Sequence, residues 1–532
     1  DLRRIAVIGP DADNISAAGG GSGLVPPSSA VSVVDGLRAR LGDGVRVEYA
    51  PGVDPFGSGA LLPSMPAVPS GVLSPAGGAE GEHGLRAEYW SNLSFAGEPV
   101  VVRTERQAEL NRGFFDIDAG LRASSPKLPP LPPELPPRLS ARWTGSLRAP
   151  LTGEYLLSLT SLGSARLLLD GQVQLANTPS APVAPEAATP AFGSPIGTAA
   201  SAIQVSTTAV RLTAGERYAV AVEYAADAPE QSFFKEAMLR FGWQPPADVV
   251  TPMVAEAVEL ARQADVAVVV ARTFESEAMD RPHLRLPGGQ DELIRAVKAA
   301  NPRTVVVLMS ATPVETASWE QGVPAVLEAW YAGQEQGDAV ARVLIGDVTP
   351  SGKLPLTFPR ADDQTPLSTP EQYPGVGGAV HYTEGVLVGY RGYDALGIAP
   401  QYPFGYGLSY TTFAYSDLSV TPRACDGAQP LAVQFAVENT GDRAGIEIAQ
   451  VYLGLPYAAG EPPRRLAGWA RVRLEPGERR VVAVIVDPQA PGRPLSTWDT
   501  TSGGWTAAHG EATVFVGASS RDLRLHAPVT IG

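Results

Sequence analysis

The sequence predicts a multidomain protein in which an α/β sandwich is interrupted by an antiparallel β-sandwich or barrel and followed by an immunoglobulin-like sandwich. Three observations support this fold class. Apolar runs of the parallel-strand type alternate with helical periodicity at the start of the chain and again after Pro246. Between these parts, and again after about Tyr410, short alternating strands are separated by turn residues. The 532 residues also exceed a single domain, since domains usually hold about 100–150 residues.

The first segment has the order strand, glycine-rich turn, helix and strand. We predict strands over Ile5–Ile8 and Val45–Tyr49, and a short amphipathic helix over Ser32–Leu41. The turn Gly19–Gly23 lacks the Lys-Ser/Thr pair of a phosphate-binding loop, and two prolines follow it where a dinucleotide site would begin a helix. We therefore interpret it as a loop that needs positive φ angles and close backbone approach.

A Gly-, Pro-, Ser- and Ala-rich stretch over Gly57–Gly81 has the composition of a linker, and an all-β domain follows it. Two irregular segments interrupt that domain, a rigid polyproline-like one at Pro126–Pro137 and a mobile one at Asn177–Ala200. Its predicted strands are Leu85–Tyr89, Ala141–Leu147, Gly153–Leu159, Ala165–Leu169, Tyr218–Tyr224 and Ala237–Trp243.

The α/β pattern returns after Pro246, which indicates a β domain inserted at a surface loop of the α/β domain. We assign residues 1–80 and 247–405 to the α/β domain, 83–246 to the insert and 406–532 to the last sandwich. The predicted α/β elements are helices Met253–Ala264, Glu292–Ala300 and Asp338–Ile345 and strands Val266–Val270, Thr304–Met309 and Ala325–Ala329. The last sandwich has predicted strands at Leu431–Glu438, Ile446–Leu453, Leu466–Leu474, Arg479–Val486 and Glu511–Val516.

Composition excludes several classes of function. A net charge of −15 without any cluster of Lys and Arg argues against a nucleic-acid partner. Cys425 is the only cysteine, and the five histidines have no metal-ligand spacing, so we expect no disulfide and no metal site. Apolar runs stay below the roughly 18 residues of a membrane span, which predicts a soluble protein, cytoplasmic or secreted. Because the chain starts at Asp1 and enters a strand directly, we expect a piece of a longer protein or a processed product.

The stretch from Asp265 to Ile294 combines a strand, a charged loop and the start of a helix. The loop leaves the carboxyl end of the strand, where open α/β sheets place their ligands, and a carboxylate there could donate a proton. A solvated loop carboxylate is the alternative interpretation of the same residues. The charged side chains of this loop are Glu275, Glu277, Asp280 and Arg281.

Several longer motifs resemble a known family. The segments GVPAVLEAWYAGQEQGDAVARVLIGDVTPSGKLPLTFPR, YTEGVLVGYRGYD and YPFGYGLSYTTF resemble the C-terminal half of glycoside hydrolase family 3. The segments VENTGDRAGIEIAQVYL and VFVGASSRDL resemble the fibronectin type III-like domain of that family. The insert, with LRAEYWSN, SARWTGSLRAP, TGEYLLSL and ARLLLDG, resembles the protective-antigen-type (PA14) domain found inside some β-glucosidases.

The resemblance implies a retaining exo-β-glycosidase of the β-glucosidase type that hydrolyses terminal β-D-glycosides or oligosaccharides without metal or organic cofactor. It assigns the general acid/base to Glu277, with Ala278 where the family usually has glycine and with Glu275 as the competitor. Asp280 and Arg281 are expected to hold the loop by an ion pair or caps. Three aromatic residues of the insert are candidates for the aglycone side of the site, namely Phe192, Phe233 and Phe234.

The resemblance also predicts that the second catalytic carboxylate lies outside this chain. The family carries its nucleophile, an aspartate in a Ser-Asp-Trp-like context, on a barrel, whereas no Ser-Asp-Trp occurs here and no barrel-length segment precedes Ile5. We therefore expect an N-terminal barrel in cis or in trans as partner, and no activity from this chain alone. The alternative is a catalytically inactive, truncated protein that only binds carbohydrate or a partner.

Overall fold

A computed structural model describes residues 2–14, 19–112, 138–178, 203–227, 237–277, 281, 283–373, 375–456 and 461–532. They form two compact units, one of residues 1–312 with 318–341 and the other of residues 313–317 with 342–532. The predicted polyproline segment Pro126–Pro137 and residues 179–200 of the second irregular segment lie outside the described residues. No helix in the described ranges is long and apolar enough to cross a membrane.

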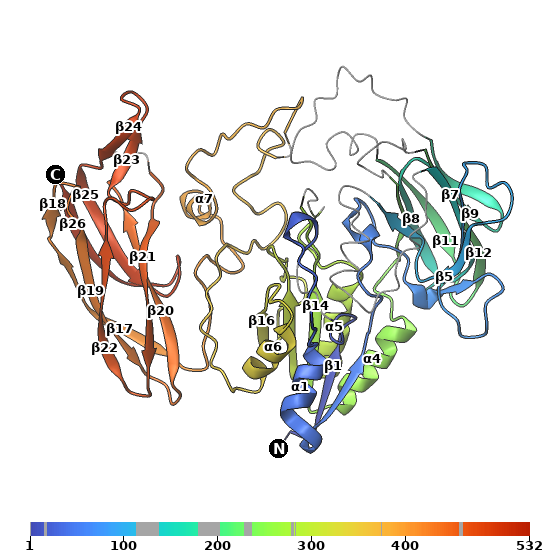
Figure 1. Cartoon of the computed structure of the whole chain (residues 1–532), viewed down its shortest axis with the longest axis horizontal. Helices are drawn as coiled ribbons and strands as arrows, with labels where there is room; N and C mark the ends of the chain where they lie inside the picture. Colours follow the sequence, from blue (N-terminus) through green and yellow to red (C-terminus); the bar gives the residue numbers. More distant parts are fainter. Residues whose placement is uncertain are drawn as a thin grey trace. The chain divides into compact units, whose positions relative to one another are not determined.

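The first unit contains an open parallel sheet with the strand order β16-β15-β14-β1-β2 (Figure 1). Strand β1 pairs with β2 on one side and with β14 on the other, so the chain reverses its direction of progress between β1 and β14. Such a reversal is the switch point at which open α/β sheets bind ligands. The strands are β1 (Arg4–Ile8), β2 (Arg46–Ala50), β14 (Val266–Arg272), β15 (Thr304–Met309) and β16 (Ala325–Glu328).

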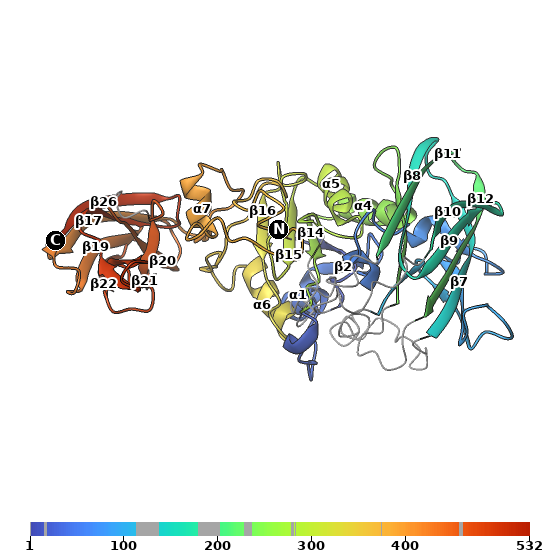
Figure 2. The same cartoon turned by 90° about the horizontal axis from the view of Figure 1, so that it is seen from above.

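Helices cover both faces of this sheet. Figure 2 shows α4 (Pro252–Gln263) and α5 (Gln290–Ala300) on one face, and α1 (Val33–Leu41) and α6 (Gln336–Leu344) on the other. Helices α1 and α4 start with side-chain caps, since the Ser32 side chain accepts a hydrogen bond from the backbone N–H of Asp35 and the Thr251 side chain accepts one from that of Val254. The predicted three-layer α/β arrangement is therefore present, with element boundaries within a few residues of those expected.

Helices α1 and α6 approach each other through glycines. A Cβ atom on Gly36 would lie 2.3 Å from the carbonyl oxygen of Gly337, and one on Gly337 would lie 2.1 Å from that of Ser32. Because both obstacles are backbone atoms, neither helix can yield without moving as a whole. An ion pair between Arg40 and Asp338 at 2.8 Å also joins the two helices.

The inserted β domain is built from two antiparallel sheets around a continuous core. One sheet has the order β10-β9-β12-β7-β4-β5, with β3 also paired to β7, and the other has the order β11-β8-β13-β6. Trp143, Tyr89 and Tyr155 are fully buried between them. The strands are β3 (Leu73–Pro75), β4 (Leu85–Trp90), β5 (Val101–Glu105), β6 (Glu109–Asn111), β7 (Arg138–Arg148), β8 (Gly153–Leu162), β9 (Ser164–Leu169), β10 (Gln172–Asn177), β11 (Gln204–Leu212), β12 (Arg217–Asp227) and β13 (Met238–Gln244).

The stretch that we predicted as a linker is largely packed into this β domain. Val68, Val72 and Leu73 are buried in its core, and residues 73–75 form β3 along the edge of β7. The buried guanidinium of Arg240 donates hydrogen bonds to the carbonyl oxygens of Gly59 at 2.8 Å and of residue 63 at 2.6 Å. The linker prediction over Gly57–Gly81 was therefore wrong for most of its length, because a glycine- and proline-rich sequence can also line a sheet in an irregular conformation.

The second unit contains α7 (Tyr390–Ala395) and a β-sandwich. Its sheets have the orders β17-β19-β22 and β18-β26-β25-β20-β21, and β23 and β24 form a separate hairpin. Val433, Phe435 and Val451 are buried in the core between the two sheets. The strands are β17 (Phe413–Thr421), β18 (Ala424–Cys425), β19 (Leu431–Asn439), β20 (Gly445–Gly454), β21 (Arg465–Leu474), β22 (Arg479–Val486), β23 (Ser496–Asp499), β24 (Gly504–Ala507), β25 (Gly510–Gly517) and β26 (Leu523–Ile531).

The contact between α1 and α6 gives a first prediction. Gly→Ala in a helix usually stabilises by about 1 kcal/mol, but Gly36→Ala should destabilise the first unit by about 1–3 kcal/mol, because its Cβ would push against the backbone of α6. The midpoint of urea unfolding measures this. Gly44→Ala is the matched control, since no atom lies within 4 Å of its added Cβ. A higher midpoint for Gly36→Ala than for Gly44→Ala would contradict the prediction.

Candidate functional site

The candidate site lies at the switch point of the parallel sheet. After β1 the chain forms the glycine-rich turn, and after β14 it forms the loop that runs from Phe274 to Glu277. Gly20 and Ser276 form a parallel bridge, so these two loops are joined by backbone pairing. The sheet thereby brings together residues that are more than 250 positions apart in the sequence.

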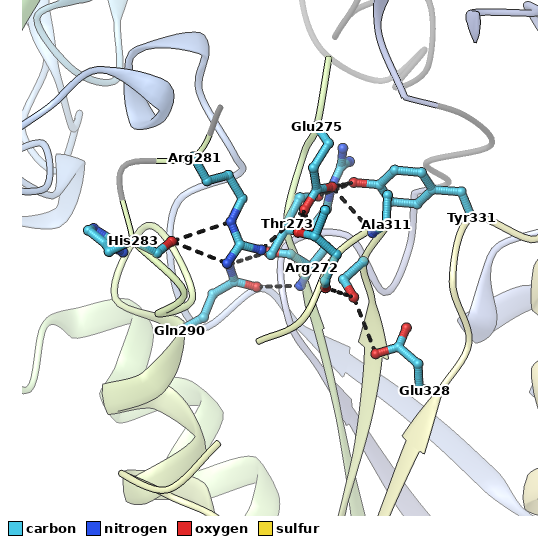
Figure 3. Close-up of polar contacts among 11 residues, drawn as sticks. Arg272, Thr273, Glu275, Arg281, His283, Gln290, Ala311, Glu328 and Tyr331 are labelled. Atoms are coloured by element: carbon cyan, nitrogen blue, oxygen red, sulfur yellow. Dashed lines mark hydrogen bonds and ion pairs between the residues drawn. The ribbon is translucent and has the colours of Figure 1, made fainter. Parts of the chain in front are cut away.

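The end of β14 is fixed on several sides, which makes it a rigid base for the loop. The side-chain amide of Gln290, at the start of α5, accepts from the backbone N–H of Arg272 at 2.8 Å and donates to its carbonyl oxygen at 2.9 Å (Figure 3). The Arg272 guanidinium forms a buried ion pair with Asp11 at 3.1 Å. It also lies 5.7 Å from the ring centroids of Phe56 and Phe274, within the range of cation–π attraction.

Glu275 is enclosed by hydrogen-bond donors, as Figure 3 shows. Both of its carboxylate oxygens accept hydrogen bonds, so the side chain is held in one orientation. The donors are Thr273 Oγ1 at 2.7 Å, Thr312 Oγ1 at 2.9 Å, Arg281 Nη1 at 3.1 Å, Ala311 N at 3.3 Å and the hydroxyl of Tyr331. Glu275 therefore connects the ends of β14, β15 and β16.

Arg281 contributes the charge that balances Glu275. The two side chains form an ion pair at 3.1 Å with 9% and 15% of their areas exposed, so the pair is mostly shielded from water. The guanidinium also donates to the carbonyl oxygen of His283 through Nε and Nη2. Burial and the neighbouring carboxylate raise the pKa of Tyr331, which keeps its hydroxyl protonated as a donor. Arg281 thus links Glu275 to the backbone at His283 within the same loop.

Glu277 lies in a different environment two residues further on. Its side chain is exposed, and its Oε2 atom accepts hydrogen bonds from the backbone N–H of Ser22 at 2.7 Å and from the Ser22 hydroxyl. These two donors, the hydroxyl more than the N–H, lower the pKa of the Glu277 carboxyl. Glu277 is therefore an accessible carboxylate held at one oxygen, whereas Glu275 is a shielded one held at both.

The remaining predicted residues of the site cannot be placed. Ala278, Asp280, Phe192, Phe233 and Phe234 lie outside the described residues.

Sequence reasoning missed several partners of the two carboxylates, namely Ser22, Thr312 and Tyr331. Two of them follow the ends of β15 and β16, and the rule that parallel strands end at one edge of the sheet could have located them. Among the described residues, no three His, Cys, Asp or Glu side chains are grouped so that they could hold a metal ion.

Glu328 is a further ionisable group at this edge, at the end of β16. Its carboxylate accepts from the backbone N–H of Trp330 at 2.9 Å and from the Ser310 hydroxyl at 3.2 Å. Burial, with a smaller contribution from the charge of Glu275, raises the pKa of Glu328 from 4.5 to about 8. The carboxyl is therefore largely protonated in the folded protein near neutral pH.

This raised pKa predicts a pH-dependent cost for folding. Between pH 4.5 and about 8 the carboxyl of Glu328 ionises in the unfolded chain but not in the folded one, so it destabilises the fold increasingly as pH rises. Glu328→Gln should therefore have little effect near pH 4 and become stabilising towards pH 8, as measured by urea unfolding across that range. Glu256→Gln, on the exposed surface of α4, is the control. A constant difference between Glu328→Gln and wild type at all pH values would refute the raised pKa.

Comparison with known proteins agrees with this architecture. Residues 1–410 match the glycosyl hydrolase family 3 C-terminal domain, and residues 447–520 match the fibronectin type III-like domain. The chain is 36% identical to a beta-glucosidase of Rhizobium radiobacter, over 99% of this chain and 59% of that protein. It is 32% identical to the probable beta-glucosidase K of Emericella nidulans, over 100% of this chain and 59% of that protein.

A solved structure with a similar arrangement is DesR, a beta-glucosidase from Streptomyces venezuelae, in complex with D-glucose. It superposes with a TM-score of 0.61 at 32% identity, over 99% of this chain and 56% of DesR. The chain thus spans a little under three fifths of the length of these relatives. Because the C-terminal domain match covers residues 1–410, this chain belongs to glycosyl hydrolase family 3.

Proposed function

We propose that this chain forms the acid/base half of a retaining exo-β-glycosidase of the β-glucosidase type, with Glu277 as the general acid/base. One observation carries the proposal: at the switch point of the sheet, Glu277 presents an accessible carboxylate held at one oxygen only. The nucleophile is an aspartate on a barrel domain supplied in cis or in trans. The similarity to beta-glucosidases of Rhizobium radiobacter and Streptomyces venezuelae supports the reaction class.

The reaction follows the double displacement of retaining glycosidases. In the first step the Glu277 carboxyl gives its proton to the glycosidic oxygen while the aspartate attacks C1 and the bond from C1 to the leaving oxygen breaks. In the second step the Glu277 carboxylate takes a proton from water, the water oxygen bonds to C1 and the ester bond to the aspartate breaks. Protons and charges balance over the two steps, and Glu277 is protonated again at the end of the cycle.

Glu275 fits this role less well than Glu277. Its oxygens are occupied by four donors from the three strand ends and by the ion pair with Arg281, so contact with a substrate would disrupt the network. The geometry favours a positioning role, in which Glu275 holds the loop and Glu277 acts on the substrate.

The surrounding domains have proposed roles as well. We assign residues 83–246 to a protective-antigen-type domain that borders the leaving-group side, where Phe192, Phe233 and Phe234 would contact the aglycone. Residues 1–80 and 247–405 form the α/β domain, and 406–532 form the fibronectin type III-like domain. The irregular part of the α/β domain at residues 57–75 packs on the insert, so it belongs structurally to both.

Substitution of Glu277 tests the proposal. In the chain combined with its barrel domain, Glu277→Gln should lower kcat/KM by about 10²–10⁴ for an alkyl or oligosaccharide β-glucoside, the usual contribution of a general acid. A dinitrophenyl β-glucoside, whose leaving group needs no proton, should lose far less in its first step. Initial rates on both substrates measure the effect. Full activity of Glu277→Gln on the alkyl glucoside would exclude the assignment.

Glu275→Gln is the matched control in the same loop. It removes one charge from the ion pair with Arg281 and should lower stability, with an activity loss that does not depend on the leaving group. Azide separates the two roles, because a small anion can replace a missing acid/base carboxylate. Glu277→Ala should form β-glucosyl azide, and Glu275→Ala should not. Azide rescue of Glu275→Ala instead would reverse the two assignments.

A further inference from the structure

The glycine-rich turn after β1 contacts the loop of the proposed acid/base residue from Gly19 to Ser22. The backbone N–H of Gly20 donates to the carbonyl oxygen of Glu275 at 2.9 Å, and the N–H of Glu277 donates to the carbonyl oxygen of Gly20 at 3.3 Å. The two segments therefore run side by side like a short parallel ladder. We call residues Gly19–Ser22 the glycine clasp.

Three successive glycines make this approach possible. A Cβ atom would lie 2.7 Å from the carbonyl oxygen of Glu275 if placed on Gly19, and 2.6 Å from the hydroxyl oxygen of Ser276 if placed on Gly20. On Gly21, which has a φ of +74°, it would lie 2.4 Å from the Cβ atom of Glu277. All three distances are shorter than carbon atoms tolerate, so no other residue fits at these positions without separating the loops.

The clasp ends on the carboxylate itself. The backbone N–H and the hydroxyl of Ser22 both donate to Oε2 of Glu277, and within the described part of the chain all hydrogen bonds to this carboxylate go to that oxygen. Two donors on Oε2 occupy its lone pairs, so a proton on the carboxyl group belongs on Oε1. The clasp thereby distinguishes the two oxygens of one carboxyl group.

We propose that the glycine clasp is a positioning element that anchors Oε2 of Glu277 through Ser22 and leaves Oε1 as the oxygen that exchanges the proton with substrate and water. The proposal rests on the proposed acid/base function of Glu277. Ser22 is a positioning residue in this scheme, because it acts on the substrate only through Glu277. The glycosidic oxygen of the substrate must then approach from the Oε1 side.

The clasp also favours one protonation state. The donors of Ser22 lower the pKa of Glu277, and no charged group in the described ranges contributes to that shift. Among the described residues of the loop, the other carboxylate is Glu275, which accepts hydrogen bonds from its own donors and is paired with Arg281. The clasp thus favours the deprotonated form of Glu277 that the second step needs. A nucleophile carboxylate nearby would raise the pKa of Glu277 and so favour the protonated form for the first step.

Titration of Glu277 in the 532-residue chain tests the clasp without any activity measurement. With ¹³C-labelled glutamate carboxyl groups, the Glu277 signal is identified by its loss in Glu277→Gln. Ser22→Ala removes the stronger of the two donors, so the pKa of Glu277 should rise towards its ordinary value, whereas Ser22→Thr keeps a hydroxyl and should leave it low. An unchanged pKa in Ser22→Ala would overturn the proposal.

The glycines give a second, matched pair of variants. Gly20→Ala should separate the loops and raise the pKa of Glu277, as Ser22→Ala does. Gly23→Ala lies just past the clasp, has no atom within 4 Å of its added Cβ, and should behave as wild type. If Gly20→Ala leaves the titration unchanged, or Gly23→Ala shifts it equally, close backbone approach is not what positions the carboxylate, and the proposal fails.

Activity of the chain combined with its barrel domain links the clasp to the reaction. The protonated acid sets the basic limb of the kcat/KM profile, so a raised pKa in Ser22→Ala moves that limb to higher pH. At the optimum we expect a roughly two- to tenfold fall in kcat for an alkyl glucoside, the effect of one hydrogen bond, with KM little changed. A fall in kcat without a shift of the basic limb would show that Ser22 has a merely structural role, and it would overturn the proposal.

The two proposals fail in distinguishable ways. If Ser22→Ala shifts the titration but Glu277→Gln remains active, the clasp holds its carboxylate as inferred and the acid/base assignment is wrong. If Glu277→Gln is inactive but Ser22→Ala has no effect on titration, the acid/base assignment stands and the clasp does not.

Discussion

The parallel pairing of β1 with β14 is the interaction on which the rest of the site depends. Ile5 to Ile8 pair in register with Val266 to Val269, although the whole inserted β domain lies between them in the sequence. Gly9 then passes so close to β14 that a Cβ atom would lie 2.0 Å from the carbonyl oxygen of Val270. The two strands end together, and their loops emerge side by side at the switch point of the sheet.

This pairing explains why two carboxylates in one short loop have opposite environments. Glu275 turns towards the ends of β15 and β16, where hydroxyl, amide and guanidinium donors converge, and it holds those strand ends together. Glu277 turns towards the loop that follows β1 and meets Ser22. Each carboxylate is thus attached to the strand neighbours on one side of β14, so the loop is fixed from both sides.

Much of the fold was predictable because its signals are local. Buried parallel strands such as Val266 to Arg272 have continuous apolar sequences, and helices such as α4 begin with a capping threonine and a proline at N1. Strands such as β11 escaped prediction. Every second residue of β11 faces solvent, and the polar side chains of this strand resemble those of a loop. The packed stretch at residues 57–75 escaped for a related reason, since irregular backbone carries no periodic pattern.

The site was predictable only in part because its decisive contacts are not local. The sequence places Glu277 and Glu275 on one loop, and the resemblance to a family orders them, but neither shows that Gly20 lies against Ser276. The glycine-rich turn was correctly interpreted as a close backbone approach, while its partner could not be named, because a glycine has no side chain to indicate what it faces. Contacts between loops more than 250 residues apart need the strand order of the sheet, which the sequence alone did not supply.

Under the proposed assignment, the clasp also bears on the location of the acid/base residue in a separate domain from its nucleophile. A carboxyl group held by two donors is mostly deprotonated near neutral pH, because the donors stabilise its anion and lower its pKa. A second carboxylate arriving about 5–5.5 Å away, the usual separation in retaining enzymes, would oppose that effect by like-charge repulsion. Protonation of Glu277 would then depend on assembly of this chain with the barrel domain. In the covalent intermediate the nucleophile is a neutral ester, so the pKa of Glu277 would fall again and favour the base form that the second step requires.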